Sequence, residues 1–448
     1  MRFQRFVSLS AFTLATVAGV PASRAATAEL RDTVRAKIDA EYPSLYTIYQ
    51  HFHTNPELSF MEVKTAALLA GELRRLGFEV TEKVGNTGIV AVMKNGPGPT
   101  VLVRADMDAL PIKETSGVPY ASTAVVKDVS GKDQPAMHAC AHDTHMTGLI
   151  GTARVLVALR ERWSGTLVMI GQPAEEILAG ARAMLSDGLY TRFPKPDYAL
   201  AFHTSSQDPA GMIGYGAGAF MSGLCSLDIL VRGVGGHGGA PQTTKDPVVL
   251  AAQIVLALQT IVSREVKPGT AAVVTVGTIH GGLKRNIIPD DVKLELSIRA
   301  FDDAVLQQQV AAIRRICGGM ARAAGVPEDR LPVITMSPES ADPLINDAVL
   351  ARRMVGVFTE WLGTERVKEA PPITGAEDFA LYGRTVDRVP IFLWRVGGTA
   401  PEKFEESKRT GIPVPSAHSS GYAPLPEPTI KAAVTSMSAA VLDLMGKK

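Results

Sequence analysis

The alternation of strand-like and helix-like segments constrains the fold of this 448-residue chain more than any other feature. Short continuous apolar runs such as TVLVRADM and GTLVMIGQ alternate with longer segments, such as TAALLAGELRRLGFEV, whose apolar residues recur at helical spacing. Continuous apolar strands between helices predict a sheet that is buried on both faces. We therefore expect an α/β domain with a central sheet covered by helices.

The order of segments changes near residue 216. From SGLCSLDILVRG to LPVITMSPES the chain reads as strand, helix, strand, strand, helix and strand, which is the split βαβ pattern of a small domain. Helical patterns and the apolar strand IFLWRVGG then return, and KFEESKRTGIPVPS is expected to be a charged loop. Because 448 residues exceed one ordinary core, we expect a first domain in two pieces, residues 27–215 and 337–448, with residues 216–336 inserted between them.

The N-terminal segment has the pattern of a secretory signal peptide. MRFQRF carries two arginines, VSLSAFTLATVAGV is apolar but short for a membrane span, and Ser23 and Ala25 are small residues at the expected cleavage site. A membrane anchor and a buried first helix are the alternatives. We predict cleavage of residues 1–25, a periplasmic or secreted location, and no stable membrane anchor after cleavage.

Composition and cysteine content narrow the classes of partner. The formal net charge is +1 and no long basic block occurs, so nucleic acid is not an expected partner. The chain has three cysteines, and a Cys225–Cys317 disulfide with Cys140 free is one interpretation. Two buried, unpaired cysteines are the other interpretation.

The segment HACAHDTHM holds three of the nine histidines and one of the three cysteines. Cys140 and His142 have the spacing of two metal ligands on one short arc, although such a pair alone is more often part of a loop. A metal site therefore needs further ligands from elsewhere in the chain.

Polar residues at the ends of several predicted strands could supply those ligands. Asp106 and Asp108 end one strand, Glu175 and Glu176 end a second, His203 ends a third, and His418 lies in a later loop. In an open α/β sheet the carboxyl ends of the strands meet at one edge. Thiolate, imidazole and carboxylate together suit divalent Zn, Co, Ni or Mn, and adjacent glutamates could act as ligand and general base.

Three further motifs have ordinary structural explanations. His237 lies among glycines in a predicted hairpin, and Asn286 precedes a proline turn. Glu377 and Asp378 of GAEDF lie at an expected helix start, where capping is the default role.

Taken in order, the motifs RADMDALPI, HACAHDTHM, QPAEE, FHT, GVGGHGGAP, GG…NIIPD and GAEDF resemble those of a known family. This family comprises the aminoacylase and carboxypeptidase-like co-catalytic metallopeptidases. The resemblance is greatest to their amidohydrolase branch of hippurate hydrolases, N-acyl-amino-acid amidohydrolases and auxin-conjugate hydrolases. The family commonly has a glycine where this chain has Ala141.

The resemblance implies a catalytic domain that binds two metal ions and an inserted ferredoxin-like lid that often dimerises, so a homodimer is expected. Glu175 would be the general base, and Asp108 would support the metal ligands. His237 would stabilise the oxyanion, from the partner subunit if the geometry requires it, and Asn286 would hold the substrate carboxylate. The implied metal ligands are Cys140, His142, Glu176, His203 and His418.

The predicted function is that of a metal-dependent amidohydrolase that cleaves small N-acylated amino acids to a carboxylate and an amino acid. A dipeptidase or carboxypeptidase on the same two-metal scaffold is the first alternative. A non-catalytic periplasmic protein that binds a metal or a small amide is an alternative of another class. The presence of Glu175 argues against the binding protein, because metal storage needs no free base.

Overall fold

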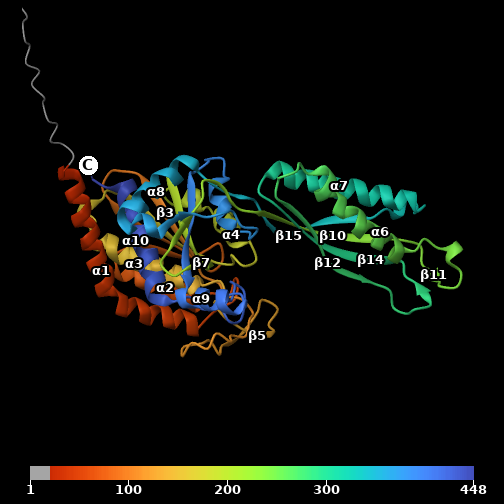
Figure 1. The fold of residues 1–448 in the computed structure, drawn as a ribbon, viewed down its shortest axis with the longest axis horizontal. Coiled ribbons are helices and arrows are strands. Elements are labelled where there is room, and N and C mark those ends of the chain that lie inside the picture. Colours follow the sequence, from red (N-terminus) through yellow and green to blue (C-terminus); the bar gives the residue numbers. More distant parts are fainter. Residues whose placement is uncertain (1–20, 448) are drawn as a thin grey trace, which may run out of the picture.

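The computed structural model describes residues 21–447, with side chains from residue 27 onward. Residues 1–20 of the predicted signal peptide lie outside the described part of the chain. The remainder forms a large domain and an elongated second domain that extends away from it (Figure 1). Because residues 342–447 return to the large domain after the second one, the first domain is built from two pieces.

An eight-stranded mixed sheet forms the centre of the large domain. Its central strands pair in parallel and are buried along most of their length, as their continuous apolar sequences predict. In spatial order the strands are β1 (Glu79–Val84), β2 (Gly88–Asn95), β6 (Gly165–Gln172), β3 (Thr100–Asp106), β7 (Tyr198–Pro209), β18 (Ile391–Thr399), β8 (Ile213–Tyr215) and β17 (Val367–Glu369).

Helices cover both faces of this sheet. The larger apolar core lies under α1 (Pro21–Thr54), α2 (Val63–Arg75), α3 (His142–Ala158), α8 (Ala348–Leu362) and α10 (Pro426–Met445). The core on the other face lies under α4 (Gly180–Ser186), α5 (Leu189–Arg192) and the short helix η6 (Asp378–Gly383). The predicted fold class, a central sheet covered by helices, is confirmed.

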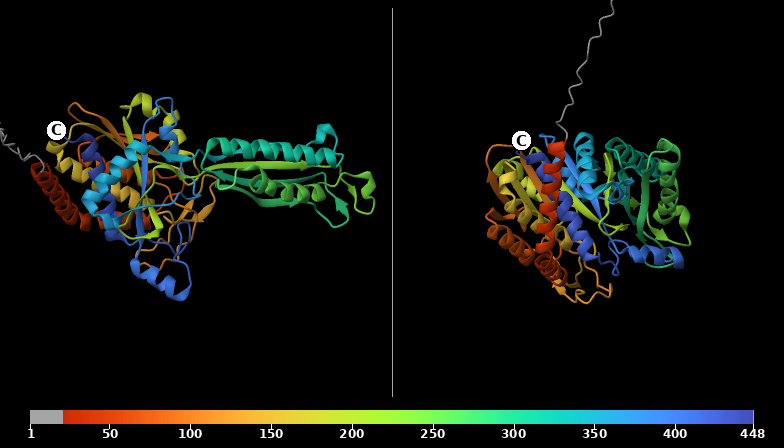
Figure 2. Two further views of the ribbon diagram at one scale, coloured as in Figure 1. Left: turned by 45° about the horizontal axis from the view of Figure 1, so that its top comes forward. Right: turned by 60° about the vertical axis from the view of Figure 1, so that its left-hand side comes forward.

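The inserted domain, called the lid below, has the predicted element order. Its elements are β10 (Gly223–Arg232), α6 (Pro247–Thr260), β12 (Ala272–Gly281), β14 (Asp291–Ala300), α7 (Asp303–Ala323) and β15 (Val333–Ala341). The antiparallel sheet order β12-β14-β10-β15 is that of a ferredoxin-like unit, and both helices share one apolar core with it. Figure 2 shows the lid as a narrow extension of the molecule.

The chain crosses between the domains a few residues later than the sequence suggests. The expected start at 216 precedes β9 (Gly218–Met221), which pairs with β16 (Leu344–Asn346), and the expected end at 336 falls inside β15. The lid therefore spans residues 223–341. Strand pairing determines where the lid begins and ends. Pairing between segments that are distant in the chain cannot be predicted from the local sequence.

The expected charged loop KFEESKRTGIPVPS is partly wrong, because α9 (Pro401–Thr410) is a helix that projects from the large domain (Figure 2, left). Pro401 begins it, and Lys408–Glu405 and Arg409–Glu406 ion pairs at i, i+3 spacing support it. The minor elements are β4 (Val125–Lys127), β5 (Asp133–Pro135), β11 (Gly236–His237), β13 (Ile287–Ile288), η1 (Arg160–Arg162), η2 (Pro241–Thr243), η3 (Ile261–Glu265), η4 (Glu328–Arg330) and η5 (Thr364–Arg366).

The two interpretations of the cysteines are distinguished within the described residues. Cys140, Cys225 and Cys317 are all free and buried, so the two lid cysteines are unpaired core residues. One helix, Pro247–Glu265, is long and apolar enough to cross a membrane by length and composition. Leu250, Ile254 and Leu258 on that helix pack into the lid core, as in a globular domain.

Candidate metal centre

The five predicted ligand residues come together at the carboxyl edge of the large sheet. They reach it from five places in the chain: the segment before α3, the start of α3, the turn after β6, strand β7 and the loop before α10. Their ligand atoms form two groups in which all atoms lie within 4.8 Å of one another. The groups are Cys140, His142 and His203, and Cys140, Glu176 and His418.

Cys140 lies between the two groups. Its Sγ is 3.5 Å from Nε2 of His203 and 3.2 Å from Nε2 of His418. His418 Nε2 is also 3.4 Å from a carboxylate oxygen of Glu176. Cys140 therefore belongs to both groups and would contribute its thiolate to holding a divalent cation.

Two ligand histidines are oriented by hydrogen bonds on their outer side. Nδ1 of His142 lies 2.8 Å from the backbone carbonyl of Asp108, and Nδ1 of His203 lies 2.8 Å from that of Thr204. Each ring must donate from Nδ1, because a carbonyl only accepts. In the neutral rings both Nε2 atoms then carry lone pairs directed into the cluster, as metal ligation requires.

His145 is close to the cluster but is not available as a ligand. The backbone N–H of Thr204 donates to its Nε2 at 2.8 Å. Nδ1 therefore carries the proton and donates to a carboxylate oxygen of Asp106. Of the histidines in HACAHDTHM, His142 is the one whose ring nitrogen faces Cys140 and Glu176.

Unpaired buried atoms show that the residues fit a bound cation. Nε2 of His142 and Oε1 of Glu176 are buried and have no hydrogen-bond partner among residues 27–447. They are 3.8 Å apart, and buried polar atoms are rarely left without a partner. A thiolate, imidazoles and a carboxylate suit a borderline divalent ion, so the donor set and the unpaired atoms agree.

The protein's own charges also favour a cation here. Burial raises the pKa of Glu176 to about 8, and it raises the pKa of the Cys140 thiol well above its usual value, with Glu176 adding to the effect. For His142 burial opposes the imidazolium, but Asp106, Asp108 and Glu176 together outweigh burial and raise the pKa to about 10. Without a cation the cluster retains protons, and a divalent ion would take their place.

The turn that carries Glu175 and Glu176 is held by two buried carboxylates. Asp108 accepts hydrogen bonds from the backbone N–H groups of Glu175 and Glu176, at 3.1 and 3.0 Å. Glu62 accepts from the N–H of Ala174 at 2.9 Å. Ala174 has φ 50°, a left-handed conformation that a non-glycine residue adopts only when its surroundings impose it. Three successive N–H groups are thus fixed, and the predicted supporting role of Asp108 has a geometric basis.

Glu175 is 5% exposed, and its carboxylate lies 3.8 Å from Nε2 of His142. Burial, with Glu377 and Glu176 nearby, raises the pKa of its carboxyl well above the usual range. Glu175 therefore lies beside the ligand cluster as a group that can accept and return a proton.

A buried arginine behind the cluster has a role that motif analysis missed. Arg104 is 1% exposed and donates to Asp106 at 2.6 Å and to Glu377 at 2.8 Å. Glu377 also caps η6 by accepting from the N–H of Phe379, so its predicted capping role is confirmed but is not its only one. The sequence TVLVRADM nevertheless indicated a structural role for Arg104, because a charged residue inside an apolar strand needs a buried partner.

Ala141 takes the conformation that a glycine would adopt easily. Its φ is 66°, and it lies between Cys140 and the first residue of α3. The departure from the family's usual glycine therefore leaves the turn itself in place.

His237 and Asn286 are not part of the cluster within one chain. His237 belongs to β11, which pairs with β13, and the N–H of Gly238 donates to the carbonyl of Asn286 at 2.9 Å. Figure 1 places β11 at the far end of the lid, away from the edge where β3 and β7 end. The two lid residues lie side by side, but the fold of one chain does not bring them to the metal ligands.

Comparison with known proteins gives a consistent result. Residues 102–408 match the model of peptidase family M20/M25/M40. The chain is 37% identical to thermostable carboxypeptidase 2 of Saccharolobus solfataricus over 366 residues, which cover 80% of this chain and 86% of the relative. It is 41% identical to the hippurate hydrolase of Campylobacter jejuni over 277 residues, which cover 62% and 69% of the two chains.

The fold comparison agrees. A Bacillus subtilis protein described as a dinuclear metal binding peptidase of the M20 family superimposes with a TM-score of 0.73 and 28% identity. The match covers 91% of this chain and 99% of that one. The chain belongs to peptidase family M20/M25/M40, in its amidohydrolase branch, and is an enzyme that hydrolyses amide C–N bonds.

Proposed function

We propose that this enzyme is a metal-dependent amidohydrolase that cleaves small N-acylated amino acids to a carboxylate and an amino acid. The observation that carries the proposal is a complete set of five ligand residues beside a glutamate that is not needed as a ligand. The hippurate hydrolase from Campylobacter jejuni, a relative at 41% identity, supports the substrate class.

Two divalent ions would be held by the two groups that share Cys140. When bound, they supply Lewis acidity toward an amide carbonyl and toward water. Zn, Mn, Co and Ni all suit the mixture of sulfur, nitrogen and oxygen donors. The dinuclear Bacillus subtilis structure supports the number of ions.

Glu175 would act as the general base and then as the general acid. Its carboxylate takes a proton from the attacking water and returns that proton to the amide nitrogen as the C–N bond breaks. The turn held by Glu62 and Asp108 keeps the backbone of Glu175 fixed during both transfers. Proton transfer by a positioned side chain contributes about 10²–10⁴-fold to the rate.

A homodimer would bring His237 and Asn286 to the metal centre. The lid has the surface for such an association, because Val249 and Leu256 on α6 are 54% and 73% exposed. Strand β12 is at the edge of the lid sheet, and its Ile279 is 53% exposed. Exposed apolar residues beside an unpaired strand edge favour pairing with a second copy. The His237 imidazole of a partner would then stabilise the oxyanion.

Carboxypeptidase or dipeptidase activity is the second candidate, because the 37% identical Saccharolobus solfataricus relative is named a carboxypeptidase. The test uses the mature chain, loaded separately with Zn, Mn, Co and Ni. Amine release is followed on N-acetyl and N-benzoyl amino acids and on dipeptides, with and without a chelator. Chelator-sensitive release from N-acyl amino acids supports the proposal, and preference for dipeptides favours the second candidate. Metal binding without turnover of either class would contradict both.

We also propose that the enzyme is exported and acts in the periplasm or outside the cell. The two arginines, the short apolar run and the small residues Ser23 and Ala25 support this proposal. N-terminal sequencing of the protein from a periplasmic extract should begin near residue 26, and a full-length cytoplasmic product would contradict export.

A further inference from the structure

A cavity of about 610 Å³ lies at the junction of the two domains, apart from the metal ligands. It is lined by both strands through which the chain crosses, at Leu224 and Ala341, and by α7 of the lid. The large domain contributes Arg182 from α4 and Arg384 next to η6. Its volume is within the range of small-molecule sites, about 300–1,000 Å³.

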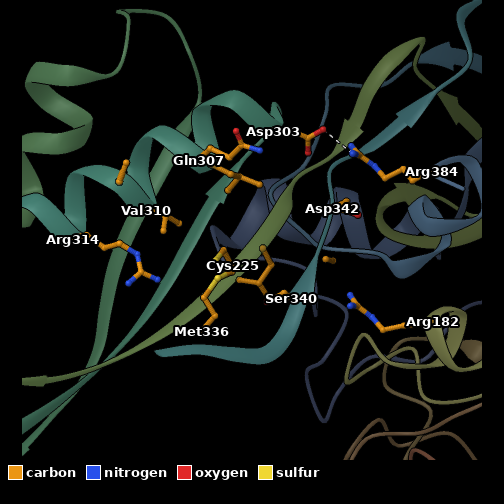
Figure 3. A pocket seen from close by; sticks show the side chains of 14 residues that line it. Arg182, Cys225, Asp303, Gln307, Val310, Arg314, Met336, Ser340, Asp342 and Arg384 are labelled. Atoms are coloured by element: carbon orange, nitrogen blue, oxygen red, sulfur yellow. Dashed lines mark hydrogen bonds and ion pairs between the residues drawn. The ribbon is translucent and has the colours of Figure 1, made fainter. Parts of the chain in front are cut away.

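Two of the cavity's arginines lack an acidic partner. Arg182, on the large domain, and Arg314, on the lid, form no ion pair within the part of the chain that the structure describes. Arg384 differs, since it is bound to Asp303 at 2.7 Å and to the carbonyl of Pro343 at 2.7 Å. Figure 3 shows Arg182 and Arg314 at opposite ends of the cavity. Each domain therefore presents one uncompensated guanidinium to the same space.

Apolar side chains line part of the space between the arginines. Leu306 and Val310 of α7, Leu224 of β10 and Met336 of β15 line it. Met336 is 54% exposed, which is unusual for a side chain beside a domain core. In Figure 3, Val310, Cys225 and Met336 lie between the two arginines. An apolar surface flanked by cations matches the chemistry of an organic anion with an apolar body.

We propose that this cavity binds a small organic dicarboxylate whose apolar body covers the floor and whose two carboxylates pair with Arg182 at one end and Arg314 at the other. Because the two arginines belong to different domains, a bound anion would bridge the domains and favour one lid orientation over others. Arginine suits this role, since its planar guanidinium can donate two parallel hydrogen bonds to a carboxylate.

The cavity lies behind the turn that carries Glu175 and Glu176. Leu178, two residues after Glu176, packs with Leu224 and Ala341. Arg182 directly follows Ala181, whose N–H donates to Asp378 at 2.9 Å. A ligand on this wall would therefore contact Leu224 and Ala341, which pack against the segment that follows Glu176.

Asp342 is the one feature of the lining that opposes an anion. It has no ion pair among the described residues, whereas Asp303 is neutralised by Arg384. The proposal therefore predicts how the replacement of Asp342 changes the affinity of the cavity for an anion. Asp342→Asn should tighten the binding of a carboxylate, because a repulsive charge is removed.

Octanedioate binding to the Zn-loaded, full-length mature enzyme tests the proposal by titration calorimetry. Octanedioate that reaches the metal centre binds there in every variant, so differences between variants report on the cavity. The double variant R182Q/R314Q should weaken octanedioate binding at least about tenfold, since two charge-assisted contacts are lost. D342N should strengthen it, and octanoate, which has one carboxylate, should bind more weakly than octanedioate.

The matched control is Arg315→Gln. Arg315 is next to Arg314 on α7, but it pairs with Glu265 outside the cavity. R315Q should leave octanedioate binding unchanged. Equal affinities in the wild type, R182Q/R314Q and R315Q would overturn the proposal, as would equal weakening by both sets of substitutions.

Hydrogen exchange tests the bridging of the domains. Saturating octanedioate should slow amide exchange in residues 221–224 and 341–344 of the wild type, and it should not do so in R182Q/R314Q. Unchanged exchange in the wild type would show that the ligand does not restrain the crossing strands.

Discussion

The reactive glutamates are positioned by hydrogen bonds to the backbone rather than to their own side chains. Glu62 and Asp108 together fix three successive N–H groups of the turn from Ala174 to Glu176. This arrangement leaves the carboxylates of Glu175 and Glu176 directed into the cluster, so that one can bind a metal and the other can move a proton.

Glu175→Gln removes the proposed base and keeps the shape of the side chain. Turnover should fall by about 10³-fold, because proton transfer by a positioned group contributes 10²–10⁴-fold. Metal content should equal that of the wild type, since the five ligand residues are untouched. Steady-state kinetics and elemental analysis measure both, with the exposed Glu161→Gln as the control. Retained turnover would remove Glu175 from its assigned role.

Glu62 is predicted to act as a positioning residue through one oxygen. Its Oε1 accepts from the N–H groups of Phe60 and Ala174, both at 2.9 Å, and both residues have left-handed φ angles. Glu62→Gln keeps a carbonyl oxygen there and should retain kcat within about twofold. Glu62→Met removes the acceptor and should lower kcat about tenfold or more, because small displacements of a catalytic group are costly.

The readouts for Glu62 are kcat, KM, metal content and the unfolding midpoint, measured on both variants. A purely structural role predicts a lower midpoint in E62M with unchanged kcat. That result, or equal loss of kcat in E62Q and E62M, would contradict the positioning role.

His53 should make stability depend on pH. It is fully buried, with Nδ1 2.7 Å from Asp143 and Nε2 3.0 Å from Glu114. Burial opposes its charge, but the two carboxylates outweigh burial and raise the pKa to about 9. A pKa above the unfolded value, about 6.5, means that the stabilisation is complete below pH 6.5 and is lost as pH rises through 9.

The stabilisation at low pH is on the order of 3 kcal/mol. Urea midpoints measured from pH 6 to 10 should therefore fall for the wild type, and they should approach those of His53→Gln at the alkaline end. The exposed His51→Gln on the same helix should follow the wild type. A constant difference between the wild type and H53Q across this range would refute the titration.

Among the elements, α4 positions the reactive turn by close packing. A Cβ atom on Gly180, at the start of α4, would lie 1.5 Å from the carbonyl oxygen of Pro173. The first residues of α4 are thus in direct contact with the segment that leads into Glu175. The helix and the turn form one unit, since neither can move without the other.

Gly180→Ala should displace this turn and lower kcat about tenfold or more, with metal content as a second readout. The matched control is Gly319→Ala on α7, where an added Cβ meets no atom within 4 Å. G319A should raise stability by about 1 kcal/mol, since alanine is the better helix former, and should leave kcat unchanged. Wild-type kcat in G180A would show that the turn tolerates the displacement.

At the scale of the molecule, the length of the lid decides which residues can share a site. β11 and β13 lie at the far end of a domain that joins the rest of the molecule through two strands (Figure 1). Residues at that end meet a metal centre most simply in a second subunit. The isolated chain therefore brings together the proposed ligands and the proposed base, and a dimer would provide the group for the oxyanion.

Mixing two inactive variants tests this arrangement. E175Q and H237A are each expected to be inactive as homodimers. A mixed dimer contains one site with Glu175 from one chain and His237 from the other. Co-expression of the two should restore about a quarter of wild-type activity, because half of randomly formed dimers are mixed and each has one intact site. No recovery with proven mixed dimers would place His237 outside the partner's site.

Much of the architecture follows from local sequence. The apolar runs became buried parallel strands, and the six segments after β9 became a ferredoxin-like unit, because side-chain periodicity determines which surfaces each element must bury. The metal-ligand set followed from residue type and from positions at strand ends. Thiolate, imidazole and carboxylate groups gathered at one sheet edge are typical of a metal site. The order of the motifs along the chain also matched that of a known family.

Tertiary contacts decided which of the candidate residues take part in the site. The sequence offered several histidines in HACAHDTHM, but hydrogen bonds to Asp106 and Thr204 removed His145 from the ligand set and left His142. Glu62 gave no signal, because its partner Ala174 is 112 positions away. The separation of His237 from the metal ligands depends on how the lid joins the large domain. Residue type and periodicity therefore determined the kind of chemistry and the elements, whereas hydrogen-bond partners distant in sequence decided which atoms remain free to perform it.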